Sequence, residues 1–228
     1  MNVELITATP EGELVAALAA ALTHSDMTPE KLKEERDEGK LTALLGRVMK
    51  MGHTSVAEHV SFTFAVSGVS RSLTHQLVRH RIASYSQQSQ RYVSLSQPSY
   101  VTPPKIGRDE RLRGAYGETM ARIWAEYNKL LSLGIPAEDA RYVLPNGSTT
   151  NIIVTMNARA LLNFFELRCC NHAQWEIREL AWKMLNLVRE AAPTIFSEAG
   201  PACVTKGYCP EHDTGCPRYP KKSEKGEE

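Results

Sequence analysis

The chain has 228 residues, of which 42% are hydrophobic and 23% charged, which suits one compact domain with a core, or one domain with short appendages. Its formal net charge of +1 argues against a globally basic nucleic-acid binder, and no apolar stretch approaches the roughly 20 residues that a membrane span needs. The N-terminus lacks the basic start and apolar core of a signal peptide, so we expect a cytoplasmic protein.

The first sixty residues carry mainly helical signals. Residues 13–22 are rich in Ala and Leu and predict a helix, and the Thr-Pro-Glu of residues 28–30 predicts the start of a second, charged helix. Ser55 and Glu58 have the spacing of a capping box, which predicts a short helix from Ser55 onward.

The next segment changes its hydrophobic period. Apolar and small polar residues alternate over 62–67, which predicts a strand. Residues 69–81 place a polar stripe beside an apolar one at helical spacing, which predicts a helix to about residue 81. Arg79 and Arg81 would point about 200° apart on a continuing helix, so either the helix ends here or the two arginines serve different ligands. Residues 82–104 are expected to be irregular or extended, because prolines near the end of this segment exclude a helix there.

The second half is mostly helical. Residues 108–132 predict a long, charged, amphipathic helix, and 136–144 a short one. A β-branched run at 148–156 predicts a strand, and 157–192 predict a long helical region or two helices. The charged tail, 221–228, is expected to be disordered. Because helices dominate and strands are few, the predicted fold class is α+β in a single domain.

The five cysteines are predicted to be free thiols in a reducing compartment, and none stands in a nucleophile motif. A zinc site in the C-terminal part is the alternative. The gap between Cys203 and Cys209 is too wide for a Cys-x₂₋₄-Cys knuckle, so a four-ligand set there has to use His212. We therefore expect no metal. The cysteines are Cys169, Cys170, Cys203, Cys209 and Cys216.

The run from Arg79 to Arg91 is the most informative part of the chain. It contains Arg79, His80, Arg81, Ser89 and Arg91, with further Ser and Gln residues and no carboxylate. Arginine offers a planar fork of donors that matches phosphate or an ionised heterocycle. Such a density of cations without acids is costly in a folded chain unless an anion occupies the site. The run therefore indicates an anionic small molecule such as a nucleotide.

Other interpretations of this run are a solvated charged face or a nucleic-acid patch. A nucleic-acid patch predicts a basic face with interleaved aromatic residues, but only Tyr85 and Tyr92 lie in the run and the net charge is near neutral. We therefore expect no nucleic acid and no membrane as partners. An interaction domain stapled by zinc at the C-terminal cysteines remains a further alternative.

The same run resembles the flavin-dependent thymidylate synthases, whose signature is Arg-His-Arg, any seven residues, then Ser. Here the signature is Arg79-His80-Arg81 followed by Ser89. A block at 52–59 precedes it and a helical motif at 157–168 follows it, in the family's order, and the resemblance spans roughly residues 40 to 200. Without the resemblance, the block at 52–59 would be a helix cap with a satisfied histidine, and Asp139–Pro145 a salt-bridged helix end.

The resemblance implies the reductive methylation of dUMP to dTMP. The one-carbon unit comes from 5,10-methylenetetrahydrofolate and the hydride from reduced FAD, which NADPH regenerates. It also implies a small central sheet surrounded by long helices, of the thymidylate synthase-complementing type, and a homotetramer with active sites at subunit interfaces. The family domain is expected at 1–200, with a Cys-containing extension at 201–228. A related alternative is another flavoprotein acting on a nucleotide, such as a reductase without methyl transfer.

The resemblance also assigns roles to single residues. Arg168 lies against the pyrimidine and activates it, since a cation beside N3 favours its ionisation. The family often has Asn-Glu where this chain has Ser86-Gln87, so hydrogen bonds to ribose could survive but a carboxylate role could not. Expected substrate contacts are Gln76, Arg79, Gln87, Ser89, Arg91 and Arg141, and expected flavin contacts are Ser55, Arg79, His80, Arg81, Gln87, Asn157, Arg159 and Asn163.

Overall fold

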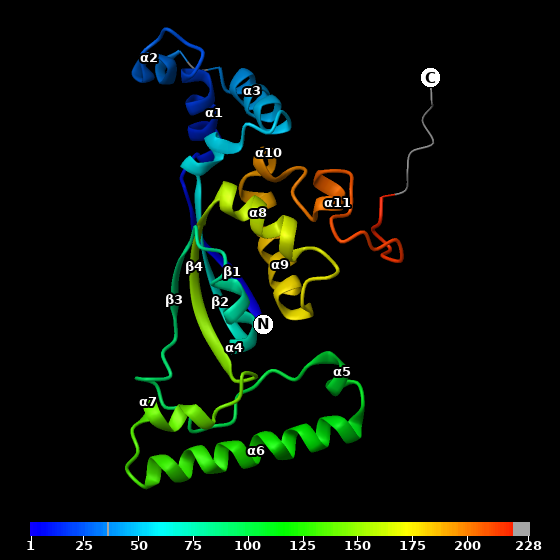
Figure 1. Ribbon diagram of the computed structural model, residues 1–228. Coiled ribbons are helices and arrows are strands. Elements are labelled where there is room, and N and C mark those ends of the chain that lie inside the picture. Colours follow the sequence, from blue (N-terminus) through cyan, green and yellow to red (C-terminus); the bar gives the residue numbers. More distant parts are fainter. Residues whose placement is uncertain (36, 221–228) are drawn as a thin grey trace. The chain divides into compact units, whose positions relative to one another are not determined.

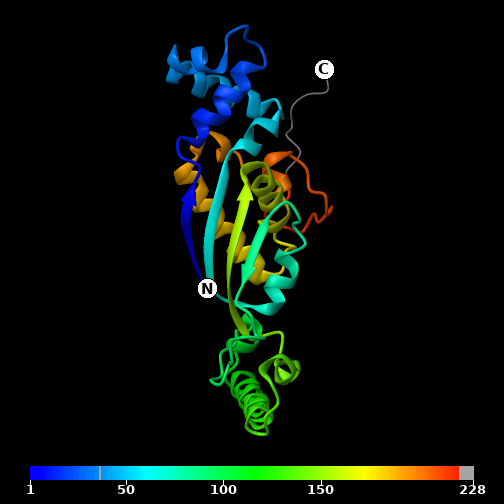
Figure 2. The same cartoon turned by 90° about the vertical axis from the view of Figure 1, so that its left-hand side faces the viewer.

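Four strands form one antiparallel sheet in the order β1-β2-β4-β3 in the computed structural model, which describes residues 1–35 and 37–220 (Figures 1 and 2). The predicted strands at 62–67 and 148–156 are confirmed as β2 and β4. β1 was not predicted, although Val3 and Leu5 alternate with polar residues at its start. The strands are β1 (Asn2–Ala8), β2 (Ser61–Ser70), β3 (Ser84–Gln87) and β4 (Thr149–Asn157).

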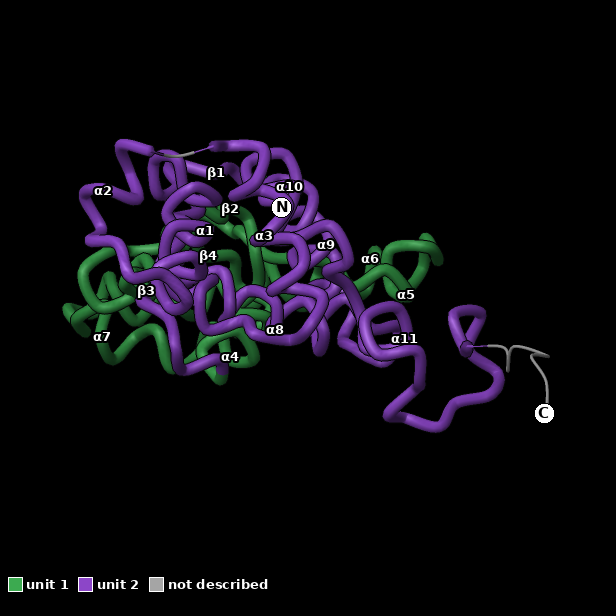
Figure 3. The backbone as a smooth tube through the Cα atoms, turned by 90° about the horizontal axis from the view of Figure 1, so that it is seen from above, with its two compact units in different colours: residues 1–2, 65–79, 85–153 green, residues 3–64, 80–84, 154–228 purple. Residues whose placement is uncertain are grey.

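The described chain divides into two compact units, which Figure 3 colours separately. Unit 1 comprises residues 1–2, 65–79 and 85–153, and unit 2 comprises residues 3–64, 80–84 and 154–228, of which the structure describes all but 36 and 221–228. All four strands contribute residues to both units. The predicted α+β fold with a small sheet is confirmed.

Unit 1 is organised by one long helix. The predicted helix at 108–132 is confirmed as α6, where the Asp109 carboxylate caps the backbone N–H groups of Arg111 and Leu112. Its buried face includes Trp124, whose indole N–H donates to the carbonyl of Leu95 at 2.8 Å. This bond fixes the segment before α6 against the helix. The helices of unit 1 are α4 (Arg71–Leu77), α5 (Pro104–Gly107), α6 (Glu110–Ser132), α7 (Ala137–Ala140) and η2 (Arg141–Val143).

Unit 2 has an aromatic core. Phe62 of β2 packs edge to face against Phe196 at 5.5 Å between ring centroids, and Phe165 packs against Phe196 at 5.9 Å. The predicted helical region at 157–192 is two helices, α8 and α9, which contact each other. The helices of this unit are α1 (Gly12–Leu22), α2 (Pro29–Glu34), α3 (Glu38–Lys50), η1 (Thr54–His59), α8 (Ala158–Arg168), α9 (Trp175–Ala191), α10 (Pro193–Phe196) and α11 (Ala202–Thr205).

Three local predictions were wrong. The helix expected at 69–81 is α4, which begins at Arg71 because β2 continues to Ser70, whose side chain then caps the helix. The short helix expected from Ser55 is present as η1, but it has no side-chain cap at its start, so the capping box of Ser55 and Glu58 does not form. Pro104 begins α5 instead of excluding a helix, since proline is tolerated in a first turn. The predicted disorder of 221–228 concerns residues outside the described part of the chain.

Candidate functional site

The predicted site residues fall into two sets according to the unit that carries them. In unit 1, Arg91 and Arg141 meet at Glu138. The Arg91 Nε donates to the Glu138 carboxylate at 2.6 Å, and the Arg141 Nε donates to the Glu138 backbone carbonyl at 2.9 Å. The Arg91–Glu138 pair is about half exposed, so it is a surface ion pair that an incoming anion could displace at low cost. The structure therefore brings together two arginines that lie far apart in sequence.

Arg71, at the start of α4, is a cation that the sequence analysis missed. Its Nη1 is buried and has no hydrogen-bond partner within the described residues. Burial and the charge of Arg141 lower the pKa of Arg71. A buried guanidinium nitrogen without an acceptor is costly, and an anion would supply the acceptor. Without structure, Arg71 was indistinguishable from a surface residue of the helix that it begins.

Neutral polar side chains complete the set in unit 1. The Gln87 Nε2 donates to the hydroxyls of Thr74 and Thr150 at 3.2 and 3.3 Å, so it is anchored by neutral acceptors. The Ser89 Oγ accepts from the backbone N–H of Arg91 at 3.1 Å. The Gln76 Nε2 donates back to the helix carbonyl of Ser72 at 3.4 Å.

The Arg-His-Arg triplet is the point where the chain passes from one unit to the other. Arg79 is the last residue of a unit 1 segment, and His80 and Arg81 belong to unit 2. α4 has already ended at Leu77, so the two arginines do not continue one helix. Both arginines are exposed and His80 is partly buried.

In unit 2, Arg168 pairs with a neutral partner. Its Nε donates to the His80 Nε2 at 3.1 Å, and the His80 ring packs edge to face against Phe164 at 4.9 Å. Burial and the charge of Arg168 lower the pKa of His80 from 6.5 to about 4. The imidazole is therefore neutral at pH 7 and accepts the hydrogen bond, with the proton on its other nitrogen. This partner orients the guanidinium without neutralising its charge.

α8 presents different groups on its two faces. Leu161 and Phe164 are fully buried, whereas Arg159 and Asn163 are exposed. Asn157 was expected only as a ligand contact. Its Oδ1 also caps α8 by accepting a hydrogen bond from a backbone N–H at 2.8 Å.

α8 also contacts η1, the 3₁₀ helix that carries Ser55. Arg159 on α8 forms an exposed ion pair with Glu58 on η1, which ties the two elements together. Ser55 is exposed on the same short helix. The set of unit 2 thus offers exposed hydroxyl, amide and guanidinium groups from two packed elements.

Comparison with known proteins identifies the family. Residues 4–194 match the family model described as thymidylate synthase complementing protein. The chain is 50% identical to a flavin-dependent thymidylate synthase of Geobacter sulfurreducens, covering 95% of this chain and 94% of the relative. It is 49% identical to a protein of the same name from Clostridium tetani, covering 95% and 93%.

Among solved structures, the chain is similar to a UMP/dUMP methylase, PolB, from Streptomyces cacaoi, bound with 5-Br dUMP. The TM-score is 0.74 and the identity 26%, covering 86% of this chain and 93% of that one. This likeness supports the fold, while the family model and the curated relatives cover most of the chain at high identity. The chain belongs to the thymidylate synthase complementing family, that of the flavin-dependent thymidylate synthases.

Proposed function

We propose that this protein converts dUMP to dTMP by reductive methylation. In this proposal 5,10-methylenetetrahydrofolate donates the carbon, and FAD, reduced by NADPH, is the flavin cofactor. The names of the curated relatives support a flavin-dependent thymidylate synthase, and the similar solved structure, that of a UMP/dUMP methylase, supports dUMP as the methyl acceptor.

The observation that best supports an anionic nucleotide is the group of arginines in unit 1. Arg71 has a buried Nη1 without a partner in the described residues, and Arg91 and Arg141 converge on Glu138. A phosphate dianion accepts several charge-assisted hydrogen bonds and suits the planar fork of arginine. We assign the phosphate and sugar of dUMP to this group, together with Gln76, Arg79, Gln87 and Ser89.

Arg168 is proposed to act on the pyrimidine. For C5 to be electron-rich, negative charge has to develop at the N3–C2=O edge of the base, and a fixed cation there stabilises it. His80 accepts from Arg168 as a neutral ring, so the arginine keeps its full positive charge for the base. A carboxylate in the place of His80 would offset that charge.

The exposed groups of unit 2 fit a flavin dinucleotide. Arg159 is a suitable donor to the diphosphate, and Ser55, Asn163 and Asn157 are neutral donors for ribityl and ring oxygens. His80 and Arg81 are proposed to contact the flavin as well, with Arg79 and Gln87 from unit 1. When bound, the flavin supplies the hydride, which no side chain can carry. The protein's own part is therefore binding, orientation and electrostatics.

Assembly and compartment belong to the proposal too. Arg159 and Asn163 are exposed on a helix whose other face is buried, which suits a helix at a subunit boundary, so we propose a homotetramer with its active sites between subunits. Sedimentation that gives a monomer with full turnover would contradict it. None of the five cysteines forms a disulfide, which suits the reducing cytoplasm that we propose. Within the described residues, no helix is both long and apolar enough to cross a membrane.

The proposal is tested by incubating the purified protein with dUMP, methylenetetrahydrofolate, FAD and NADPH and measuring dTMP by mass spectrometry. We expect dTMP that depends on FAD and on methylenetetrahydrofolate. NADPH oxidation without dTMP would instead identify a nucleotide-binding flavoprotein reductase, and the methyl-transfer proposal would be wrong.

A further inference from the structure

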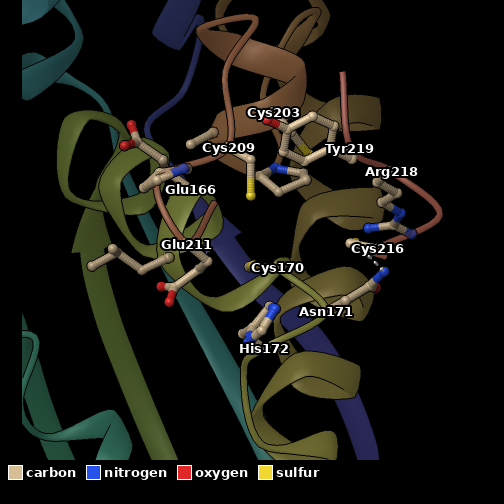
Figure 4. A pocket seen from close by; sticks show the side chains of 14 residues that line it. Glu166, Cys170, Asn171, His172, Cys203, Cys209, Glu211, Cys216, Arg218 and Tyr219 are labelled. Atoms are coloured by element: carbon tan, nitrogen blue, oxygen red, sulfur yellow. Dashed lines mark hydrogen bonds between the residues drawn. The ribbon is translucent and has the colours of Figure 1, made fainter. Parts of the chain in front are cut away.

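Four of the five cysteines line one cavity in unit 2 (Figure 4). Cys170 follows the end of α8, and Cys203 lies in α11. Cys209 and Cys216 come from the irregular segment after α11. The fifth cysteine, Cys169, is fully buried and does not line this cavity.

The cavity gives a different set of four candidate metal ligands from the one that the spacing of the C-terminal cysteines indicated. From spacing alone, Cys203, Cys209 and Cys216 needed His212 as a fourth ligand. His212 does not line the cavity, whereas Cys170, from far upstream in the chain, does. The fold therefore assembles four thiols from three segments, and a set of four cysteines is one of the common ligand sets for a structural zinc ion, together with Cys₃His and Cys₂His₂.

Polar contacts already dock the C-terminal segment onto the turn after α8. The Asn171 Nδ2 donates to the Cys216 Sγ at 3.3 Å, and His172 pairs with Asp213 at 2.9 Å. An N–H group that donates to sulfur is the type of second contact that supports a metal-bound thiolate. These contacts hold Cys216 next to Asn171, the residue that follows Cys170.

A cation also lines the cavity. It is Arg218, from the same C-terminal segment as Cys209 and Cys216. Its guanidinium is held over the Trp182 ring at 4.8 Å and would offset part of the negative charge of four thiolates.

We propose that Cys170, Cys203, Cys209 and Cys216 bind one thiophilic divalent metal ion, with Zn²⁺ as its representative. Binding exchanges four thiol protons for the ion, which leaves a tetrathiolate complex and releases four protons. The ion staples the C-terminal segment to the end of α8. The inference does not depend on the reaction proposed above, because none of these thiols is among the residues assigned to dUMP or flavin.

The sulfurs have to move for the ion to bind. As they stand, no three His, Cys, Asp or Glu side chains in residues 1–35 and 37–220 are spaced to hold a metal. Zinc–sulfur bonds are about 2.3 Å long, so the four sulfurs must converge. Cys209 and Cys216 lie in a segment of turns and loops, most of whose residues are exposed, so this segment is the part that closes.

The test is a metal titration of the full-length protein. The protein is purified under reducing conditions, stripped with a chelator, and titrated with Co²⁺ alone. We expect sulfur-to-cobalt charge-transfer absorption that saturates at one ion per chain and disappears when Zn²⁺ is added. Elemental analysis of protein purified without chelator should give one zinc per chain, and zinc should raise the Tm.

Matched variants decide which residues are ligands. Cys170→Ser and Cys216→Ser should each lose the charge-transfer band and the Tm gain, while circular dichroism reports whether they fold. Cys169→Ala and His212→Ala should keep both signals. Two results would overturn the proposal. One is a wild-type protein that takes up no cobalt. This includes the case in which a thiol count without reductant shows that these cysteines have formed disulfides. The other is a site that survives Cys170→Ser but is lost in His212→Ala.

Discussion

The arginines of the two units have partners of opposite character. In unit 1, Arg91 donates to a carboxylate, Glu138, across an exposed ion pair. In unit 2, Arg168 donates to His80, a ring that burial and the arginine itself keep neutral. Both partners orient a guanidinium, but only Glu138 also opposes its charge.

This difference is consistent with the two tasks that the proposed function assigns to the arginines. A cation that binds a dianionic phosphate can exchange one anionic partner for another, because an exposed ion pair contributes only about 0–1 kcal/mol. A cation that stabilises charge developing on a neutral base has to be undiminished before the reaction starts, because its effect comes from preorganisation. The neutral His80 provides this condition for Arg168.

Replacing Arg168 should have the largest effect. Arg168→Ala removes the cation assigned to the base, and loss of one such group lowers kcat by about 10²–10³-fold. The measurement is dTMP formation under saturating dUMP. Arg168→Lys is the matched control, and we expect it to recover part of the activity, because it restores the charge without the planar fork. An Arg168→Ala enzyme with near-normal kcat and a raised KM would place Arg168 among the phosphate ligands instead.

Replacing Arg71 should weaken binding without affecting chemistry to the same extent. Arg71→Met removes a charge-assisted hydrogen bond of about 1.5–3 kcal/mol, which raises the Kd for dUMP by about 10–100-fold. Isothermal titration calorimetry with dUMP measures it. The control is Arg111→Met, because the Arg111 side chain is 94% exposed on α6 in the same unit. An unchanged Kd in Arg71→Met would remove Arg71 from the site and leave its buried nitrogen unexplained.

Because His80 is neutral in the folded protein, we expect the stability of the protein to depend on pH. Its pKa is about 4 in the folded protein, below the ordinary 6.5, so the unfolded chain binds the proton first as the pH falls. The stability from neutral His80 is complete above pH 6.5 and is lost as the pH falls toward 4. Urea unfolding across that window should give a decline in stability that is smaller in His80→Gln, whose amide can accept from Arg168 but does not titrate. Equal slopes in the two proteins would mean that His80 is not the group responsible.

The helices and the residue classes of the site were easier to predict from sequence than the contacts. α6 and β4 were predictable because their hydrophobic periods are clear over many residues. The pairing of His80 with Arg168 was not, because it depends on which segments the fold brings together. Arg71 was missed for the same reason. It is a candidate because its Nη1 is buried without a partner in the described residues, and burial of one atom leaves no sequence pattern.

Short elements were the other weakness of the sequence analysis. η1 has the letters of a capping box, yet Glu58 pairs with Arg159 instead of closing back on the helix start. A tertiary partner thus outcompeted a local one. At Asn157 the local bond does form, since this residue, predicted as a ligand contact, is also the cap of α8.

Ser89 should show the smallest effect of the residues in the signature. Its Oγ accepts a backbone hydrogen bond from Arg91, and within the described residues no base hydrogen-bonds to it, so it is not activated as a nucleophile. A lost neutral hydrogen bond is equivalent to about 0.5–1.5 kcal/mol, so Ser89→Ala should lower kcat/KM by about tenfold or less. Steady-state kinetics with varied dUMP measures this, and the loss should fall mainly on KM. A kcat reduced as strongly as in Arg168→Ala would give Ser89 a covalent role and would remove the division of tasks between the two kinds of arginine.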